Sequence, residues 1–398
     1  MKQIYPATIT GKSFAAGGSV LDHRFGQSDP YTLGVEEEYM LLDAETFDLV
    51  QHIDTVLAAV EGHELESRIN PELMQSVLEI ATPVCRTAAD VAKELRTLRG
   101  YVTEVAAKKG LRVGSAGTHP FSLFERQRIT ARDRYRNLVD QLQYVARREL
   151  IFGMHVHVAV DDAEKAIQIV NGLLVELPTL LALSASSPFW RGEPTGLASS
   201  RQMVFAAFPR SGPPPRFRDY GDYAEVVGQL EKTGCIADYT HIWWDLRLHP
   251  KWGTVEIRIC DAVTSLEDAV AIAAYCQALV KLYSEMYDRK EQIPSFHRIL
   301  TTENKWLAAR YGLEAPVMDL LTGRRNRVPV AQLIRRRLRD LVPHARELGA
   351  ERELEGVREI LARGNGSDRQ LRVFNANRDI AEVVREIAAA TEVAVVSP

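Results

Sequence analysis

The chain has 398 residues, 46% of them hydrophobic and 26% charged, and a formal net charge of −4. This composition is typical of a globular protein with one large domain or two, and the slightly negative charge gives no reason to expect nucleic acid as a partner. No segment approaches the roughly 18 uninterrupted apolar residues of a membrane span, and the N-terminus has no charged region followed by an apolar run. We therefore expect a cytoplasmic protein with no membrane partner. Its four widely spaced cysteines are expected to be reduced packing residues.

Apolar periodicity and turn residues divide the chain into three regions. Residues 1–30 are rich in glycine, serine and aspartate and are expected to form a loosely held lead-in. Strands are predicted over 31–43, 77–82, 111–116, 151–160, 242–249 and 254–260, the last two as a hairpin around a turn at 250–253. Helices are predicted over 53–60, 135–148 and 163–183, and from a capping pair at Thr87 and Asp90 to Gly110.

A long loop is predicted over 184–215, and the pattern beyond residue 266 is almost entirely helical. Hairpins and long helices take the place of a regular strand–helix alternation. We therefore predict an α+β fold with a largely antiparallel, six-stranded sheet and flanking helices. The core is expected at 31–315, with a helical C-terminal region at 316–398 packed on it.

Three consecutive glutamates interrupt the apolar strand predicted over 31–43. Because side chains on a strand alternate, Glu36 and Glu38 share one face and Glu37 points to the other. Two such carboxylates lie about 7 Å apart and repel each other unless a cation sits between them. A solvated acidic edge strand is the alternative, but the apolar flanks of this segment favour a cation site.

Three further polar pairs fall on otherwise apolar segments. Carboxylate oxygens suit Mg²⁺ or Mn²⁺, and an imidazole among them favours Mn²⁺ slightly. A guanidinium beside a metal-binding carboxylate fits a phosphate clamp, because its planar fork matches the phosphate oxygens. The pairs are Glu72 with Glu79, His155 with His157, and Glu256 with Arg258.

Each of these signals also has a less specific explanation. A His-x-His strand occurs in packed sheets and in metal-dependent hydrolases, and His119 before Pro120 fits a turn as well as a site. Arg369 and Arg372 follow a glycine-rich segment, where they could reach a phosphate. Neither a Gly-x-x-x-x-Gly-Lys phosphate loop nor a Rossmann fingerprint is present, so a nucleotide must be held by metal ions and side chains.

Taken together, six ordered segments resemble the motifs of the carboxylate–amine ligase family, also called glutamate–cysteine ligase type 2, in the glutamine synthetase superfamily. The resemblance covers roughly residues 30–315 and implies a curved antiparallel sheet of the glutamine synthetase type, whose concave face holds the metals. The segments are Gly-Val-Glu-Glu-Glu at 34–38, Asn-Pro-Glu to Glu-Ile-Ala-Thr-Pro at 70–83, Gly-Met-His-Val-His at 153–157, Ser-Pro-Phe-Trp-Arg-Gly at 187–192, Thr-Val-Glu-Ile-Arg at 254–258 and Asn-Lys-Trp-Leu-Ala-Ala-Arg-Tyr-Gly at 304–312.

The resemblance implies a role for each site residue. In the Gly-Met-His-x-His strand of glutamine synthetase the first histidine binds a metal and the second lies by the nucleotide. The segment 368–372 departs from the Arg-Gln-Arg pattern expected in this family. The expected metal ligands are Glu36, Glu38, Glu72, Glu79, His155 and Glu256, and the expected nucleotide contacts are His157, Arg258, Arg369 and Arg372.

The function implied is an ATP-dependent carboxylate–amine ligase that uses Mg²⁺ or Mn²⁺ and joins the γ-carboxylate of glutamate to cysteine or another amine through an acyl phosphate. We expect catalytic roles for Arg258 and Glu79. Arg201, in the long loop, is expected to hold the substrate α-carboxylate, because that group needs a fixed cation. The expected partners are small molecules, and a homo-oligomer is left open. A metal-dependent hydrolase built on His155 and His157 is the main alternative, followed by a binding protein with a degenerate site.

Overall fold

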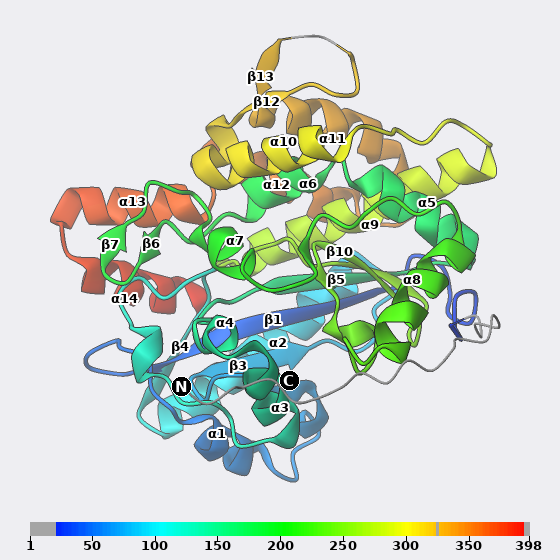
Figure 1. Cartoon of the computed structure of the whole chain (residues 1–398). Helices are drawn as coiled ribbons and strands as arrows, with labels where there is room; N and C mark the ends of the chain where they lie inside the picture. The colour runs from blue at the N-terminus through cyan, green and yellow to red at the C-terminus, as the bar shows by residue number, and fades with distance from the viewer. Residues whose placement is uncertain (1–20, 324–325, 394–398) are drawn as a thin grey trace, which may run out of the picture.

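A seven-stranded antiparallel sheet crosses the middle of the protein (Figure 1). The computed structural model describes residues 21–323 and 326–393, so most of the predicted lead-in lies outside the described residues. The strand order is β10–β11–β5–β1–β3–β2, and β4 pairs with the far half of β1. The strands are β1 Leu33–Asp43, β2 Ile69–Pro71, β3 Val77–Ala81, β4 Leu111–Gly114, β5 Met154–Ala159, β10 Leu246–His249 and β11 Thr254–Ile257.

The prediction of an α+β fold with a largely antiparallel sheet is confirmed, but the number of strands is seven and not six. The additional strand, β2, has only three residues, which is too short for an alternating pattern to show. The predicted hairpin forms from β10 and β11 around a turn at Gly253, whose φ of +66° suits glycine. A Cβ at Gly253 would lie 2.5 Å from the carbonyl oxygen of Arg24, so the described end of the lead-in packs against this turn.

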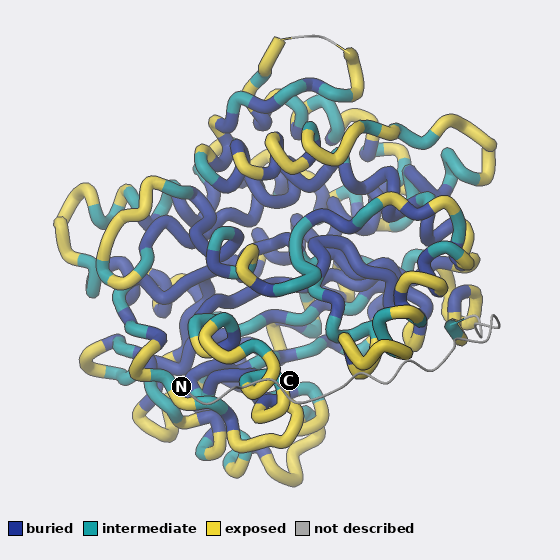
Figure 2. Tube along the Cα trace, in the orientation of Figure 1, coloured by how far each residue is buried: buried dark blue, intermediate teal, exposed yellow. Residues whose placement is uncertain are grey.

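The helices surround the sheet and bury one of its faces. They are α1 Ile53–Val60, α2 Ala88–Lys108, α3 Asp133–Leu142, α4 Tyr144–Arg147, α5 Ala163–Leu173, α6 Leu177–Ser184, α7 Ser200–Phe205, α8 Tyr220–Lys232, α9 Leu266–Asp288, α10 Arg298–Tyr311, α11 Val330–Glu347, α12 Glu351–Arg363, α13 Gly366–Asn377 and α14 Ile380–Thr391. Figure 2 shows the central strands buried and the exposed positions concentrated on outer helices and connections. The capping box predicted at Thr87 and Asp90 begins α2.

Several stretches differ from their predicted structure. The helix predicted over 135–148 is broken at Gln143 into α3 and α4, and the strand predicted over 242–249 is broken into β9 Trp243–Trp244 and β10. The helix predicted over 163–183 is two helices, α5 and α6, bent by 68°, with Pro178 in the first turn of α6. The pattern hid the bend because both helices are buried nearly all round. The loop predicted over 184–215 contains α7 and three two-residue strands, β6 Phe189–Trp190, β7 Glu193–Pro194 and β8 Ser211–Gly212. This ordered segment holds Arg201 in a fixed position.

Two hydrophobic clusters lie on opposite sides of β1. The odd-numbered face, with Tyr39 and Leu41, packs in the main cluster with α2, α5 and α9. The even-numbered face contributes Met40 and Leu42 to a second cluster with α14. The first half of that even face is free of apolar cover, and it carries Glu36 and Glu38.

The C-terminal helices take part in both clusters. Side chains of α11 and α12 pack in the main cluster, and those of α14 pack in the second. Two further short strands, β12 Pro316–Met318 and β13 Arg327–Pro329, precede α11. In the described ranges no single helix is long and apolar enough to cross a membrane, although α5 and α6 pass that test as a bent pair.

Candidate active site

The register of four strands brings the predicted polar pairs together on one face of the sheet. Glu38 lies opposite Glu79 across β1 and β3, and Glu36 lies opposite His155 across β1 and β5. On the other edge of β5, His157 lies opposite Glu256 of β11. Because each partner is directly opposite, all of these side chains project to the same side.

These residues line a cavity of about 430 Å³. Its floor is the acidic row, and its rim includes Trp252, which is 46% exposed and stacks on His249 with ring centroids 4.0 Å apart. Glu72, Arg201 and Arg258 also face it. The other lining residues are Leu73, Met74, Val77, Arg134, Tyr135, Leu138, Glu149, Ile151, Phe205, Phe208, Tyr239, Thr240, His241, Trp243, Arg247 and Lys251.

Three side chains at the centre of the row form a group with metal-site geometry. One ligand atom from each of Glu36, His157 and Glu256 lies within 4.8 Å of the others. His157 Nε2 is 3.6 Å from Glu36 Oε1 and 3.8 Å from Glu256 Oε1, and this buried nitrogen has no hydrogen-bond partner among the described residues. His157 Nδ1 lies 3.1 Å from the hydroxyl of Thr254, which orients the ring with Nε2 towards the carboxylates.

The family resemblance implied His155 at the metal and His157 by the nucleotide; the three-residue group contains His157, and His155 lies beside it on Glu36. His155 Nδ1 lies 3.1 Å from Glu36 Oε2, so this ring contacts the carboxylate from the side away from the three-residue group. Burial, followed by the charge of Arg258, lowers the pKa of His155 to about 4. A neutral His155 is suited to orienting Glu36 by a hydrogen bond.

A second acidic group lies beside the first and is poor in compensating cations. It consists of Glu38, Glu72 and Glu79. Burial and then the Glu72 carboxylate raise the pKa of Glu38 to about 7. Burial also raises the pKa of Glu72, and burial with the charges of Glu36, Glu72 and Glu38 raises the pKa of Glu79 well above its usual value. Three buried carboxylates that favour their protonated forms fit a site built for a cation.

Glu36 and Glu256 have the opposite character. Burial raises the pKa of each, but this effect is outweighed by His155 and His157 for Glu36 and by Arg247 and Arg258 for Glu256, so both pKa values lie below the usual range. Arg247 binds Glu256 through two nitrogens, at 2.6 and 3.0 Å. Arg258 forms an ion pair with the same carboxylate, and its buried Nε has no hydrogen-bond partner within residues 21–323 and 326–393.

Arg201 lies in the cavity wall and is held by long polar contacts, which include an ion pair with Asp261 at 3.9 Å. It is 3% exposed, its Nη1 and Nη2 donate to the carbonyl oxygens of Ile259 and Arg258 at 3.3 and 3.4 Å, and its Nε has no partner. A Cβ at Gly153 would lie 2.5 Å from Arg201 Nη2. The glycine of the Gly-Met-His segment therefore makes room for this guanidinium.

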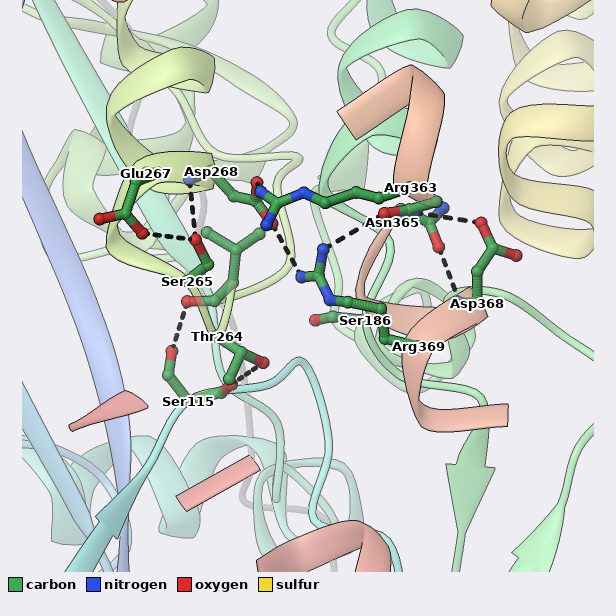
Figure 3. A network of polar contacts seen from close by, with 12 residues as sticks. Ser115, Ser186, Thr264, Ser265, Glu267, Asp268, Arg363, Asn365, Asp368 and Arg369 are labelled. Atoms are coloured by element: carbon green, nitrogen blue, oxygen red, sulfur yellow. Dashed lines mark hydrogen bonds and ion pairs between the residues drawn. The ribbon is translucent and has the colours of Figure 1, made fainter. Parts of the chain in front are cut away.

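The structure does not bring Arg369 and Arg372 to the cavity, which corrects their predicted role as nucleotide contacts. Both lie on α13, where Arg369 forms an ion pair with Asp268 at 2.8 Å (Figure 3). Arg372 donates to the carbonyl oxygen of Arg363. Asn365 and Asp368 form a capping box at the start of the same helix. The glycine-rich segment thus serves helix capping.

His119 is a structural residue in a turn. Its Nδ1 accepts from the backbone N–H groups of Phe121 and Ser122, and its Nε2 lies 2.9 Å from the carbonyl oxygen of Phe47. It does not line the cavity.

Arg247 and Glu149 line the cavity but were not among the site residues predicted from the sequence. Arg247 could have been found, because a turn at 250–253 pairs His249 with Thr254 and therefore places Arg247 opposite Glu256. No comparable pattern marks Glu149, which lies between a short helix and β5.

Comparison with known proteins decides the family. The model of glutamate–cysteine ligase family 2 matches residues 32–388. This chain belongs to that family. A family relative from Rubrobacter xylanophilus, provisionally named glutamate–cysteine ligase 2-1, is 44% identical over 92% of this chain and 95% of its own length. Another from Sorangium cellulosum, provisionally named glutamate–cysteine ligase 2, is 45% identical over 90% of this chain and 95% of its own.

Two solved structures share the fold. The glutamate–cysteine ligase of Francisella tularensis, determined in complex with AMP, matches with a TM-score of 0.64 at 13% identity over 92% of this chain and 90% of its own. A bifunctional glutathione synthetase from Pasteurella multocida matches with a TM-score of 0.63 at 15% identity over 91% of this chain and 51% of its own. Family membership supports a carboxylate–amine ligase and does not favour the hydrolase alternative.

Proposed function

We propose that this chain is an ATP-dependent ligase that joins the γ-carboxylate of glutamate to cysteine or another amine through an acyl phosphate. The observation that carries the proposal is the cross-strand row, which sets a three-residue metal group, a second acidic group and Arg258 along one cavity. Phosphoryl transfer needs this combination, because the protein must screen the triphosphate charge and align the attacking oxygen.

The donor set fits divalent cations such as Mg²⁺ or Mn²⁺. Glu36, His157 and Glu256 would hold one cation, and the unpartnered Nε2 of His157 supports this assignment. Glu38, Glu72 and Glu79 would hold a second, which would favour their ionised forms. Bound cations would supply positive charge that offsets the triphosphate.

The residues of this chain then act in two steps. A γ-carboxylate oxygen of glutamate attacks the γ-phosphorus of ATP, the bond to the ADP oxygen breaks, and Arg258 stabilises charge on the transferring phosphoryl group. The amine nitrogen next attacks the acyl carbon, phosphate leaves with the bonding electrons, and the proton lost by the amine passes to the released phosphate. Arg247 holds Glu256 from the other side, so Arg258 can turn towards the phosphate without leaving Glu256 unpaired. Arg201 binds the α-carboxylate of glutamate.

ADP release measured with glutamate and a panel of amines tests the proposal. A ligase requires ATP, the carboxylate and the amine together, and mass spectrometry of the product identifies the amine. A hydrolase built on His155 and His157 would need no ATP, and a binding protein would turn nothing over. Lack of glutamate-dependent ADP release with every amine would contradict the proposed function.

A further inference from the structure

The cavity wall contains a buried carboxylate, that of Glu149, for which the described part of the chain offers no hydrogen-bond partner. Glu149 follows α4, and its backbone N–H donates to the carbonyl oxygen of Ala146 at 3.1 Å. Both of its carboxylate oxygens are buried, and neither has a hydrogen-bond partner among the described residues. The side chain lines the cavity that contains Arg201 and the acidic row. An unsatisfied buried polar group is costly, so a site that retains one needs an explanation.

The cations nearest to Glu149 are bound elsewhere. Arg148 donates through Nη2 to the carbonyl oxygen of Val204 at 3.2 Å, and the Nη atoms of Arg201 donate to backbone carbonyls just after β11. No ion pair of Glu149 is formed within the described ranges. Burial raises the pKa of Glu149 to about 8; the charges of Arg201 and Arg148 lower it, and that of Glu38 raises it.

The same wall thus presents an unmatched acceptor and an unmatched donor. Glu149 has two free carboxylate oxygens, and Arg201 has a free Nε. A molecule that carries a cation and an anion on adjacent groups would satisfy both at once. The α-carbon of a free amino acid has this property, with an ammonium and a carboxylate on one atom.

We propose that Glu149 binds the α-ammonium group of the amino acid whose α-carboxylate is held by Arg201. The inference rests on the proposed function and deepens it, because it makes the carboxylate substrate an α-amino acid and not a simple dicarboxylic acid. A substrate without the amino group leaves Glu149 buried and unpaired. Sites of this kind reject such analogues strongly, because the polar group built to bind the missing function stays unsatisfied.

Glutamate and glutarate differ only in that amino group and provide the test. We expect wild-type protein to prefer glutamate to glutarate by at least about 100-fold in kcat/KM for ADP release. In Glu149→Gln the KM for glutamate should rise by about 100-fold, with a smaller change in kcat, while the glutarate parameters change by less than about threefold. Glu45→Gln, an exposed position outside the cavity, is the matched control and should leave the preference intact.

Calorimetric titration of the same two ligands separates this inference from the proposed function. If wild-type protein releases no ADP but binds glutamate, the proposed function fails, and the loss of preference in Glu149→Gln can still be measured as binding. An unchanged preference for glutamate over glutarate in that variant would overturn the inference. A defect whose size depended on which amine is used, and not on the carboxylate substrate, would also overturn it. Should Glu149→Gln not fold, wild-type protein alone decides, since glutarate binding as tight as glutamate binding is incompatible with the proposed ammonium site.

Discussion

Glu36, Glu37 and Glu38 occupy three successive positions of β1, yet the carboxylates on the two faces of the strand differ in the partners they have. On the helix-covered face, Glu37 is 1% exposed and binds Arg99 through Nε and Nη2 at 3.0 and 2.6 Å. The Arg99 guanidinium also donates hydrogen bonds to the carbonyl oxygens of Val263 and Thr264. On the cavity face, Glu38 lies opposite Glu79 with no such cation.

The difference shows how one strand serves both stability and chemistry. The helix-covered face (the closed face) supplies the partners of Glu37 from within the chain. The Glu37–Arg99 ion pair therefore fixes α2 and the segment before α9 against the sheet. The cavity face (the open face) leaves Glu38 and Glu79 short of cations, which is consistent with the cation site proposed above. Stability is given up at the open face for binding, as expected for a functional site.

The largest expected effect is a loss of stability when the buried Glu37–Arg99 pair on the closed face is broken. Arg99→Met leaves Glu37 buried without its partner, and removal of one member of a buried pair typically costs about 3–5 kcal/mol. Urea denaturation should show the free energy of unfolding reduced by about this amount. Arg96→Met, one turn away on α2, removes an exposed pair with Glu267 and should cost less than about 1 kcal/mol. Equal losses in the two variants would contradict the closed-face description.

A slightly smaller effect is expected in catalysis at the open face. Arg258→Ala should reduce kcat by about 100- to 1000-fold, roughly 3–4 kcal/mol, because a preorganised cation acts mainly on the transition state. The fold should persist, since Arg247 still pairs with Glu256. Arg258→Lys should recover only part of the rate, because a point charge does not reproduce the fork. Steady-state kinetics at saturating ATP measure this, and a turnover within a few-fold of wild type would remove Arg258 from the mechanism.

The open face should also give stability a particular pH dependence. The pKa of Glu38 is about 7 in the folded protein and near 4.5 when unfolded, so the folded state binds more protons between these values. The free energy of unfolding therefore falls as pH rises through that window. In metal-free protein, Glu38→Gln should be more stable than wild type by about 2 kcal/mol at pH 8, with little difference at pH 5.

Glu36→Gln is the matched control for this pH effect. It lies on the same face of β1, but its pKa is lowered in the folded protein, so the substitution should not stabilise the protein at pH 8. Chemical denaturation with a chelator present compares the two variants. If both substitutions stabilised the protein at pH 8, or if neither did, the opposite pKa shifts of Glu36 and Glu38 would be contradicted.

The smallest expected effect concerns the space beside Arg201. Gly153→Ala places a Cβ against the guanidinium, so we expect the KM for glutamate to rise by roughly tenfold, about 1.4 kcal/mol. Gly228→Ala, on α8 with no heavy atom within 4 Å of its added Cβ, should instead stabilise the protein by about 0.5–1 kcal/mol and leave kinetics unchanged. Identical kinetics for the two variants would show that Gly153 does not position Arg201.

Alternation along single strands was the part of the site that could be predicted from the sequence. The period of two separates Glu37 from Glu36 and Glu38 and puts His155 and His157 together, because neither inference needs a distant residue. The family motifs added the expectation that these strands meet. Which histidine joins the three-residue group could not be predicted in this way, since the group around His157 Nε2 depends on the register between β5 and β11.

Long-range pairs and buried helices account for the rest. The Arg99–Glu37 pair joins residues far apart in the chain, and no local pattern selects Arg99 among the arginines of α2. The bend between α5 and α6 is hidden because buried helices have no polar face from which a period can be read. Arg369 was misassigned because a glycine-rich segment before arginines looks the same whether it caps a helix or binds a phosphate.

The alternation in β1 also limits how its length can vary between relatives. Removal of a single codon between residues 33 and 36 would shift the register of the first half of the strand by one and turn its side chains to the opposite faces. Removal of Glu37 itself would make Glu36 and Glu38 adjacent, so that they would point to opposite faces of the strand. One of the two would then face the helices and Arg99, and the cavity would lose that carboxylate. Relatives should therefore tolerate substitutions in this segment far more readily than insertions or deletions of one residue.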